Sequence, residues 1–262
     1  MRAVLLAGGK GTRLSPSTRV TNKHLLPVYT PSGAFPMIYY PIRTLISGGI
    51  HDILIVSSRE HCGHIIENLS DGYDFQADFS YKIQDTDHVE MGIASALKLA
   101  KNYVNDEKFA VILGDNFFED CFKEQFETFQ QQDAPAAVFL KEVEDIRRFG
   151  CATVDESDPP QVTKIVEKPR LPESNWAVTG LYLYTPQVFE IAATLKPSGR
   201  SELEVTDINN HYCGRGLAPA FVKGYWSDMG TPESLVRTQE FVIQSGFRLY
   251  EDTVEHLEIP AT

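Results

Sequence analysis

The chain has 262 residues, of which 42% are hydrophobic and 23% charged, so it can bury a full hydrophobic core without disulfide bridges or structural metals. Its formal net charge of -12 argues against nucleic acid or an anionic membrane as the partner. The N-terminal apolar run is too short for a signal peptide, and no apolar stretch is long enough to span a bilayer, so we expect a cytoplasmic protein. The cysteines form no CxxC pair, and we expect them to be reduced thiols.

Short apolar runs alternate with helix-like stretches in the first half of the chain. Residues 2–8 are nearly all apolar and predict a buried strand, and residues 52–58 predict the next one. Residues 108–116 predict a strand that ends at an acidic side chain. Residues 35–50 carry apolar side chains at helical spacing and end at two glycines, and residues 91–104 predict another helix. This alternation predicts βαβ units, and hence an α/β fold with a mainly parallel sheet.

The second half of the chain has a more mixed pattern. Strands are predicted over residues 136–143, 161–169 and 177–186, with prolines marking the loops between them. Gly180 lies inside the last of these strands, where a missing side chain admits a ligand or a neighbouring backbone. We find no repeat, low-complexity tract or linker, so we predict a single domain over residues 1–262.

Two helices are predicted near the end of the chain from their N-terminal signals. In residues 201–212, Ser201 and Glu204 have the spacing of a capping box. In residues 229–246, Thr231 is suited to the N-cap position and the proline that follows it suits the first helical position.

The turn after the first strand is rich in glycine and in basic side chains. A dinucleotide-binding GxGxxG turn would need a glycine where Leu14 stands, and its acidic ribose partner about 20 residues on is absent. A P-loop is also excluded, because Lys10 is followed by glycine rather than by serine or threonine. Arg13 nevertheless offers a planar guanidinium group to phosphate oxygens, and Lys23 offers a compact positive charge. Backbone N–H groups of the turn can donate further hydrogen bonds to the phosphates. The sequence therefore predicts a phosphate-binding loop of another type.

A set of short motifs resembles the sugar-1-phosphate nucleotidylyltransferases, or nucleotide-sugar pyrophosphorylases, and most closely their glucose-1-phosphate thymidylyltransferase branch. In chain order the motifs are LLAGGKGTRLSPST, NKHLLPVY, PMIYYPI, LGDN, EKP, VTGLYLY, ELEVTDIN and WSDMGTPESL. The resemblance implies a Rossmann-like three-layer α/β/α nucleotidyltransferase fold with a mostly parallel, mixed central sheet. It also implies a nucleotide-binding part over residues 1–120, a sugar-phosphate-binding part over 121–225, and a metal-aspartate and helix segment over 226–262.

The reaction implied by the resemblance is in-line attack of glucose 1-phosphate on the α-phosphorus of dTTP. The products are dTDP-glucose and pyrophosphate, with Mg²⁺ as cofactor. The same reaction with UTP or another nucleoside triphosphate, or with another sugar 1-phosphate, stays open. A non-catalytic nucleotide-sugar-binding regulatory module is the alternative outside catalysis. The resemblance also implies a homo-oligomer.

The residues expected to carry the chemistry follow from the same resemblance. Arg13, Lys23, Asp115 and Lys168 are the expected catalytic residues, and Asp115 and Asp228 are the expected Mg²⁺ ligands. Gln84 would read the base, because a side-chain amide matches the N3–H and O4 edge of thymine or uracil. The full set of expected substrate-binding residues is Gly8, Gly9, Gly11, Thr12, Gln84, Gly92, Asp115, Gly150, Glu167, Lys168 and Val178.

The sequence departs from the family pattern at several places. The segments 29–41 and 84–94 are longer than usual and would border the cleft, so they bear on the choice of sugar and base rather than on the type of reaction. Phe149 stands where a tyrosine usually precedes the sugar-site glycine. The chain also ends soon after the WSDMGTPESL segment, so we expect feedback through a second nucleotide site to be weak or absent.

Overall fold

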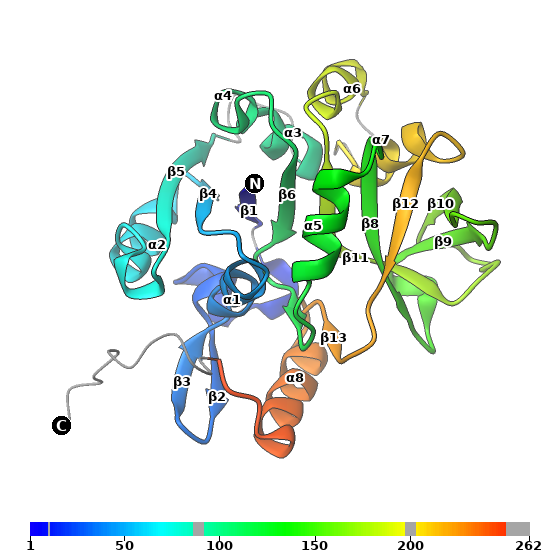
Figure 1. The fold of residues 1–262 in the computed structure, drawn as a ribbon. Coiled ribbons are helices and arrows are strands. Elements are labelled where there is room, and N and C mark those ends of the chain that lie inside the picture. The colour runs from blue at the N-terminus through cyan, green and yellow to red at the C-terminus, as the bar shows by residue number, and fades with distance from the viewer. Residues whose placement is uncertain (10, 86–91, 197–202, 250–262) are drawn as a thin grey trace.

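A computed structural model describes residues 1–9, 11–85, 92–196 and 203–249 of the chain (Figure 1). The strands are β1 (Arg2–Ala7), β2 (Pro27–Thr30), β3 (Gly33–Pro36), β4 (Asp52–Ser58), β5 (Asp78–Gln84), β6 (Phe109–Leu113), β7 (Phe117–Phe118), β8 (Ala136–Glu142), β9 (Gly150–Asp155), β10 (Gln161–Glu167), β11 (Trp176–Tyr184), β12 (Leu217–Phe221) and β13 (Trp226–Ser227). The α-helices are α1 (Tyr39–Ser47), α2 (Cys62–Leu69), α3 (Ile93–Lys98), α4 (Lys101–Val104), α5 (Lys123–Gln131), α6 (Val188–Thr194), α7 (Val205–Tyr212) and α8 (Pro232–Ser245).

A nine-stranded mixed sheet runs through the centre of the molecule in the order β10-β9-β11-β6-β1-β4-β5, and β8 and β12 extend it beside β11. The strands β6, β1, β4 and β5 pair in parallel, as the βαβ pattern predicts. Strand β11 enters antiparallel to β6, β8 and β9. The predicted α/β fold with a mixed central sheet is confirmed, and its parallel pairing is concentrated in the first half of the chain.

Helices cover both faces of this sheet, so the fold has three layers. In β1, Ala3 and Leu5 point to one face and pack with residues of α1, α2 and α5. Val4 and Leu6 point to the other face and pack with residues of α3, α6 and α7. This alternation explains why β1 is apolar throughout: a parallel strand covered on both faces has no solvent side. A third apolar cluster joins α8 to the β2–β3 hairpin.

Several predicted elements have the expected bounds. The strand at residues 52–58 is β4, and α8 begins after Thr231, whose side chain accepts a hydrogen bond from the backbone N–H of Ser234. The helix predicted over 35–50 is shorter. Its first residues belong to β3, because Gly33–Pro36 pairs with β2 in a hairpin. Its end at Gly48 is as predicted.

The other predicted helices need larger corrections. The helix predicted over 91–104 is divided into α3 and α4 by a turn at residues 99–100. The capping box predicted from Ser201 and Glu204 would place Glu204 at the third helical position. This prediction is wrong, because Glu204 occupies the N-cap position of α7. Ser201 itself, and residues 86–91 of the longer 84–94 segment, lie outside the described residues.

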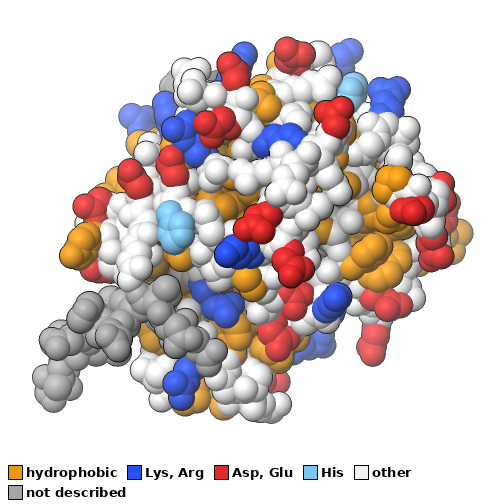
Figure 2. All heavy atoms as spheres, in the orientation of Figure 1, with side chains coloured by type: hydrophobic (Ala, Val, Ile, Leu, Met, Phe, Trp, Pro, Cys, Tyr) orange, Lys and Arg blue, Asp and Glu red, His pale blue; other side chains and the backbone are white. Residues whose placement is uncertain are grey.

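On the face drawn in Figure 2, acidic and basic side chains are interspersed over the surface. Among the described helices, none is both long enough and apolar enough to cross a membrane.

Candidate active site

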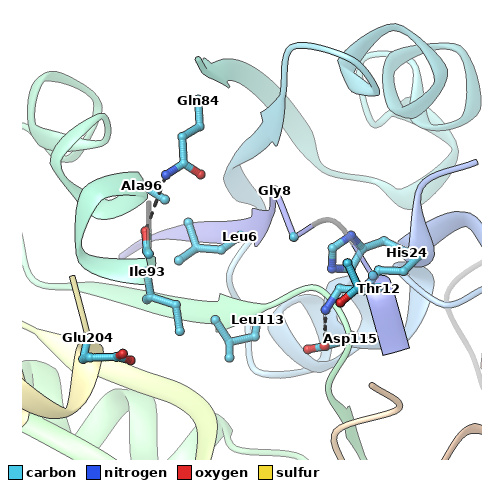
Figure 3. Close-up of a pocket in the computed structure, with 14 residues that line it drawn as sticks. Leu6, Gly8, Thr12, His24, Gln84, Ile93, Ala96, Leu113, Asp115 and Glu204 are labelled. Carbon is cyan, nitrogen blue, oxygen red and sulfur yellow. Dashed lines mark hydrogen bonds and ion pairs between the residues drawn. The ribbon is translucent and has the colours of Figure 1, made fainter. Parts of the chain in front are cut away.

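Two adjoining pockets open where the parallel strands reach their carboxyl ends. The glycine-loop pocket, of about 390 Å³, lies beside the residues that follow β1 (Figure 3). The Lys168 pocket, of about 380 Å³, lies against β9, β10 and β11. Both are lined by Lys23, Ile93, Leu113, Asp115 and Glu204. The shared residues mark the place where a ligand in one pocket would meet a ligand in the other.

Every residue that the sequence analysis selected for the site lines one of these pockets. The glycine-loop pocket takes Gly8, Gly9, Gly11, Thr12, Gln84 and Gly92. The Lys168 pocket takes Arg13, Gly150, Glu167, Lys168, Val178 and Asp228. Lys23 and Asp115 line both. The fold thus gathers these residues in one region, while their individual roles stay predictions.

The glycines of the loop allow other site residues to pack against its backbone. A methyl group on Gly8 would lie 2.9 Å from Oε1 of Gln84, and one on Gly9 would lie 3.3 Å from Cε of Lys23. Gly11 has a φ of 62°, in the left-handed region that favours glycine, and a methyl group there would lie 2.9 Å from Cβ of Lys23. Larger residues at these positions would displace Lys23 or Gln84 from the pocket wall.

Lys23 is held in place by its two neighbours in the chain. The amide of Asn22 donates to the carbonyl of Ala7 at the end of β1 (3.2 Å), and its oxygen accepts from the backbone N–H of His24 (2.8 Å). The same oxygen lies 2.6 Å from Nδ1 of His24. Burial, together with the nearby charge of Lys23, lowers the pKa of His24 to about 3. His24 is therefore a neutral support beneath Lys23 at physiological pH.

Lys23 forms an ion pair with Asp115 at the junction of the two pockets, with 2.5 Å between Nζ and Oδ2 (Figure 3). Asp115 is 8% exposed. Burial by itself would raise the pKa of this carboxyl, but Lys23, His24 and the amide of Asn116 outweigh burial and hold the pKa of Asp115 below its ordinary value. The carboxylate is therefore ionised at neutral pH.

Gln84 ends strand β5 and points toward the glycine-loop pocket (Figure 3). Its Nε2 donates to the carbonyl of Gly92 at 3.4 Å, and with respect to the described residues this leaves Oε1 and one N–H available to a ligand. Gly92 has a φ of 117°, and a methyl group there would lie 2.4 Å from the carbonyl oxygen of Leu203. The glycine is thus needed for close packing against the segment that precedes α7.

The Lys168 pocket is built around Gly150, which pairs with Glu167 on one side and with Val178 on the other. Lys168 has a φ of 45°, which is uncommon for a residue with a side chain, and its N–H donates to the carbonyl of Phe149 at 2.9 Å. Its Nζ lies 3.1 Å from Oε1 of Glu167. Backbone strain of this kind is concentrated at functional sites, because the surrounding structure must hold it in place.

Asp228 reaches the site through the short ribbon formed by β7 and β13. In this ribbon Trp226 pairs with Phe118 and Ser227 with Phe117. Asp228 directly follows β13, and both Asp115 and Asp228 line the Lys168 pocket, so the ribbon brings the two aspartates to one site although they are far apart in sequence.

Several residues of the site were not selected by the sequence analysis, and four of them contact or adjoin the charged groups. Asn22 positions Lys23, Glu204 lines both pockets, Arg148 lies 4.0 Å from Asp228, and Asn116 contacts Asp115. Asn22, Asn116 and Glu204 all lie inside motifs that carried the family resemblance. Their place in these motifs is the feature of the sequence that could have identified them as site residues. Arg148 immediately precedes Phe149. Its nearness in sequence to Gly150, the sugar-site glycine, is the one feature that could have identified it.

The donor set fits a small, hard divalent cation. Asp115 and Asp228 supply carboxylate oxygens, and Mg²⁺ is commonly held by one or two carboxylates together with water and substrate phosphates. Within the described ranges, no group of three or more histidine, cysteine, aspartate or glutamate side chains could hold a metal. The donors present therefore suit an ion that is shared with phosphate oxygens, rather than one enclosed by protein alone.

Comparisons with known proteins show which family and which fold the chain shares. A family model described as nucleotidyl transferase matches residues 2–245. The glucose-1-phosphate thymidylyltransferase of Neisseria meningitidis serogroup A is 39% identical over 92% of this chain and 82% of its own. The enzyme of the same name from Mycolicibacterium smegmatis is 35% identical over the same shares.

Solved structures show the same fold. A crystal structure of a proposed glucose-1-phosphate thymidylyltransferase from Bacillus anthracis, in complex with sucrose, is 43% identical, with a TM-score of 0.84 over 92% of this chain and 94% of that one. A UDP-glucose pyrophosphorylase complexed with UDP-glucose has a TM-score of 0.80 at 24% identity, covering 93% of this chain and 98% of that one, and shares the fold.

Proposed function

The chain belongs to the nucleotidyl transferase family, and on that premise we propose that it transfers a thymidylyl group from dTTP to glucose 1-phosphate. A phosphate oxygen of the sugar phosphate attacks the α-phosphorus of dTTP. The new P–O bond forms as the bond to the β-phosphate oxygen breaks, and pyrophosphate leaves. No proton has to be transferred in this step, so the protein's work is alignment and neutralisation of charge.

The observation that carries this proposal is the Lys23–Asp115 pair at the junction of the two pockets. Transfer between two substrates needs charged groups at the point where they meet, whereas a binding module needs only the pockets. Both side chains are largely buried, at 14% and 11% exposed, and each is supported by neighbours that hold it toward the junction. Such a pair is suited to act on both substrates at once.

Cationic side chains are distributed along the path that the phosphates would take. Lys23 would neutralise the phosphates beside the reacting phosphorus. Arg13 would hold the pyrophosphate end, and its guanidinium lies against Gly230, where a methyl group would be 2.8 Å from Nη2. Lys168 would hold the phosphate of the sugar, and Glu167 would accept hydrogen bonds from sugar hydroxyls.

Gln84 would select the base. With one Nε2 hydrogen committed to Gly92, its oxygen can accept from N3–H and its remaining hydrogen can donate to O4. This pattern fits thymine and uracil and rejects cytosine. Thymine differs from uracil by one methyl group, which gives a discrimination of only about tenfold or somewhat more, so UTP is the alternative substrate.

Asp115 and Asp228 would hold Mg²⁺. When bound, the ion supplies positive charge to phosphate oxygens at the reacting phosphorus. The protein's own contribution is to keep Asp115 ionised and to present both carboxylates to one pocket, which the lowered pKa of Asp115 and the shared pocket lining support. We also expect a homo-oligomer, and light scattering after size-exclusion chromatography checks it.

The experiment that tests this function is pyrophosphate release with Mg²⁺ and glucose 1-phosphate, run across dTTP, UTP, CTP, ATP and GTP. We expect release that requires both substrates and is fastest with dTTP or UTP. Release with another triphosphate would keep the reaction and refute the role of Gln84. No release with any triphosphate or with a wider set of sugar phosphates would favour a binding module.

A further inference from the structure

Asn116 makes hydrogen bonds to its neighbour Asp115 and to two other segments of the site. Its Nδ2 donates to Oδ1 of Asp115 at 3.1 Å. Its Oδ1 accepts from the backbone N–H of Gly180 at 3.0 Å and from Nε1–H of Trp226 at 2.8 Å. Asn116 is 2% exposed, so these bonds are formed away from water. The end of β6, the middle of β11 and strand β13 are therefore joined through one side chain.

The packing around this amide leaves it little freedom. A methyl group on Gly180 would lie 2.5 Å from Nδ2 of Asn116, so the missing side chain of Gly180 makes room for the amide. The sequence analysis expected a ligand or a backbone at that place, and the structure puts a neighbouring side chain there. The indole of Trp226 is held on its other side by the ring of Phe149, with 5.0 Å between ring centroids.

Both ends of this network lead to the aspartates that would hold the metal. Asp115 has one oxygen bound by Asn116 and the other by Lys23, so the orientation of its carboxylate is determined by these two contacts. On the other side, Trp226 lies two residues before Asp228 in the strand that carries it into the site. The hydrogen bond between Asn116 and Trp226 thus connects the supports of the two carboxylates.

We infer that Asn116 is a positioning residue that fixes Asp115 and Asp228 relative to one another, and that Trp226 is its partner in this role. The inference rests on the proposed function, because it assigns these aspartates to a divalent cation. Neither Asn116 nor Trp226 needs to contact that ion. Weakening their hydrogen bond loosens Asp228 relative to Asp115 and lowers the affinity for the metal–nucleotide complex.

The test uses two conservative variants and a matched control. Trp226→Phe removes the Nε1–H donor and keeps an aromatic ring against Phe149. Asn116→Asp keeps the acceptor for Gly180 and Trp226 and, in its ionised form, has no hydrogen to donate to Asp115. Trp176→Phe is the control, because Trp176 is the other tryptophan of the chain and packs on Phe221. The affinity for Mn²⁺–dTTP is measured by water-proton relaxation without sugar phosphate, so that no turnover occurs, and circular dichroism checks folding.

Trp226→Phe is expected to weaken Mn²⁺–dTTP binding about fivefold, the effect of losing one buried hydrogen bond. Asn116→Asp is expected to weaken it as well, although the added negative charge alone would strengthen it. Trp176→Phe should bind as the wild type does. Unchanged binding by Trp226→Phe, or tighter binding by Asn116→Asp, would overturn the inference.

The same measurements separate this inference from the proposed function. A wild-type protein that binds Mn²⁺–dTTP but releases no pyrophosphate with any sugar phosphate would refute the transferase activity, and weaker binding by both variants would still support the positioning role. Absence of Mn²⁺–dTTP binding by the wild-type protein would overturn the inference and the assignment of the two aspartates together.

Discussion

Replacement of Lys23 by methionine would leave the carboxylate of Asp115 buried without its cation. The two side chains are 14% and 11% exposed, so the pair is a buried one. Removing one partner of a buried pair costs about 3–5 kcal/mol, and we expect about 3 kcal/mol because Asp115 keeps its hydrogen bond from Asn116. This loss corresponds to a decrease in Tm of roughly 9 °C for a domain of this size.

The pH dependence gives a sharper test than the size of the loss. In the wild type the pKa of Asp115 is lowered, so the pair stabilises the fold above the ordinary carboxyl pKa, and this contribution is lost as the pH falls through the folded value. In Lys23→Met the positive charge that lowers the pKa of Asp115 is missing. Burial raises this pKa, so the pKa of Asp115 is higher in the variant than in the wild type. Protonation then relieves the unpaired charge, and the stability gap between variant and wild type narrows at acidic pH.

Urea unfolding at pH 7.5 and pH 4.5, followed by tryptophan fluorescence, measures this gap. In the folded wild type His24 does not titrate in that interval, since its pKa is about 3, and burial, the largest cause of that low pKa, is kept in Lys23→Met. Lys164→Met, which breaks the exposed Lys164–Glu173 pair, is the matched lysine control and should cost about 0.5 kcal/mol or less. The reasoning is refuted if the gap is as wide at pH 4.5 as at pH 7.5, or if adding Asp115→Asn to Lys23→Met restores no stability.

Three further predictions concern single residues. Thr231→Ala removes the N-cap hydrogen bond of α8 and should lower the free energy of unfolding by about 1 kcal/mol in urea titrations, and an unchanged value would contradict this role. Lys168→Met should raise the KM for glucose 1-phosphate by about tenfold or more, because a charge-assisted contact is lost, and should leave the KM for dTTP within about twofold of the wild-type value. An equal rise in both KM values would place Lys168 elsewhere in the reaction. His24→Gln should leave the shape of the pH–rate profile between pH 5 and 9 unchanged, since the pKa of His24 is about 3; loss of an acidic limb would show that the imidazole titrates in the working range.

Much of the local structure followed from the sequence because the information was itself local. Strand β4 has the predicted bounds, since a seven-residue segment with a short, partly β-branched apolar run has the length of a strand rather than of a helix. Helix α8 begins after Thr231 because a capping side chain and a proline act within one turn of the helix. The selected residues that line the two pockets were also chosen from the sequence, but through a resemblance between motifs rather than through their chemistry alone.

The tertiary structure decided which of these residues meet. Lys23 and Asp115 are 92 positions apart and touch because β1 and β6 are parallel neighbours whose carboxyl ends lie at the same edge of the sheet. Asp228 joins them through the pairing of β13 with β7, two-residue strands that are too short to leave a periodic signal. The place of Asn116 against Gly180 likewise depends on β11 entering the sheet antiparallel to β6. Contacts of this kind depend on strand order and register, which long-range packing determines and no local pattern encodes.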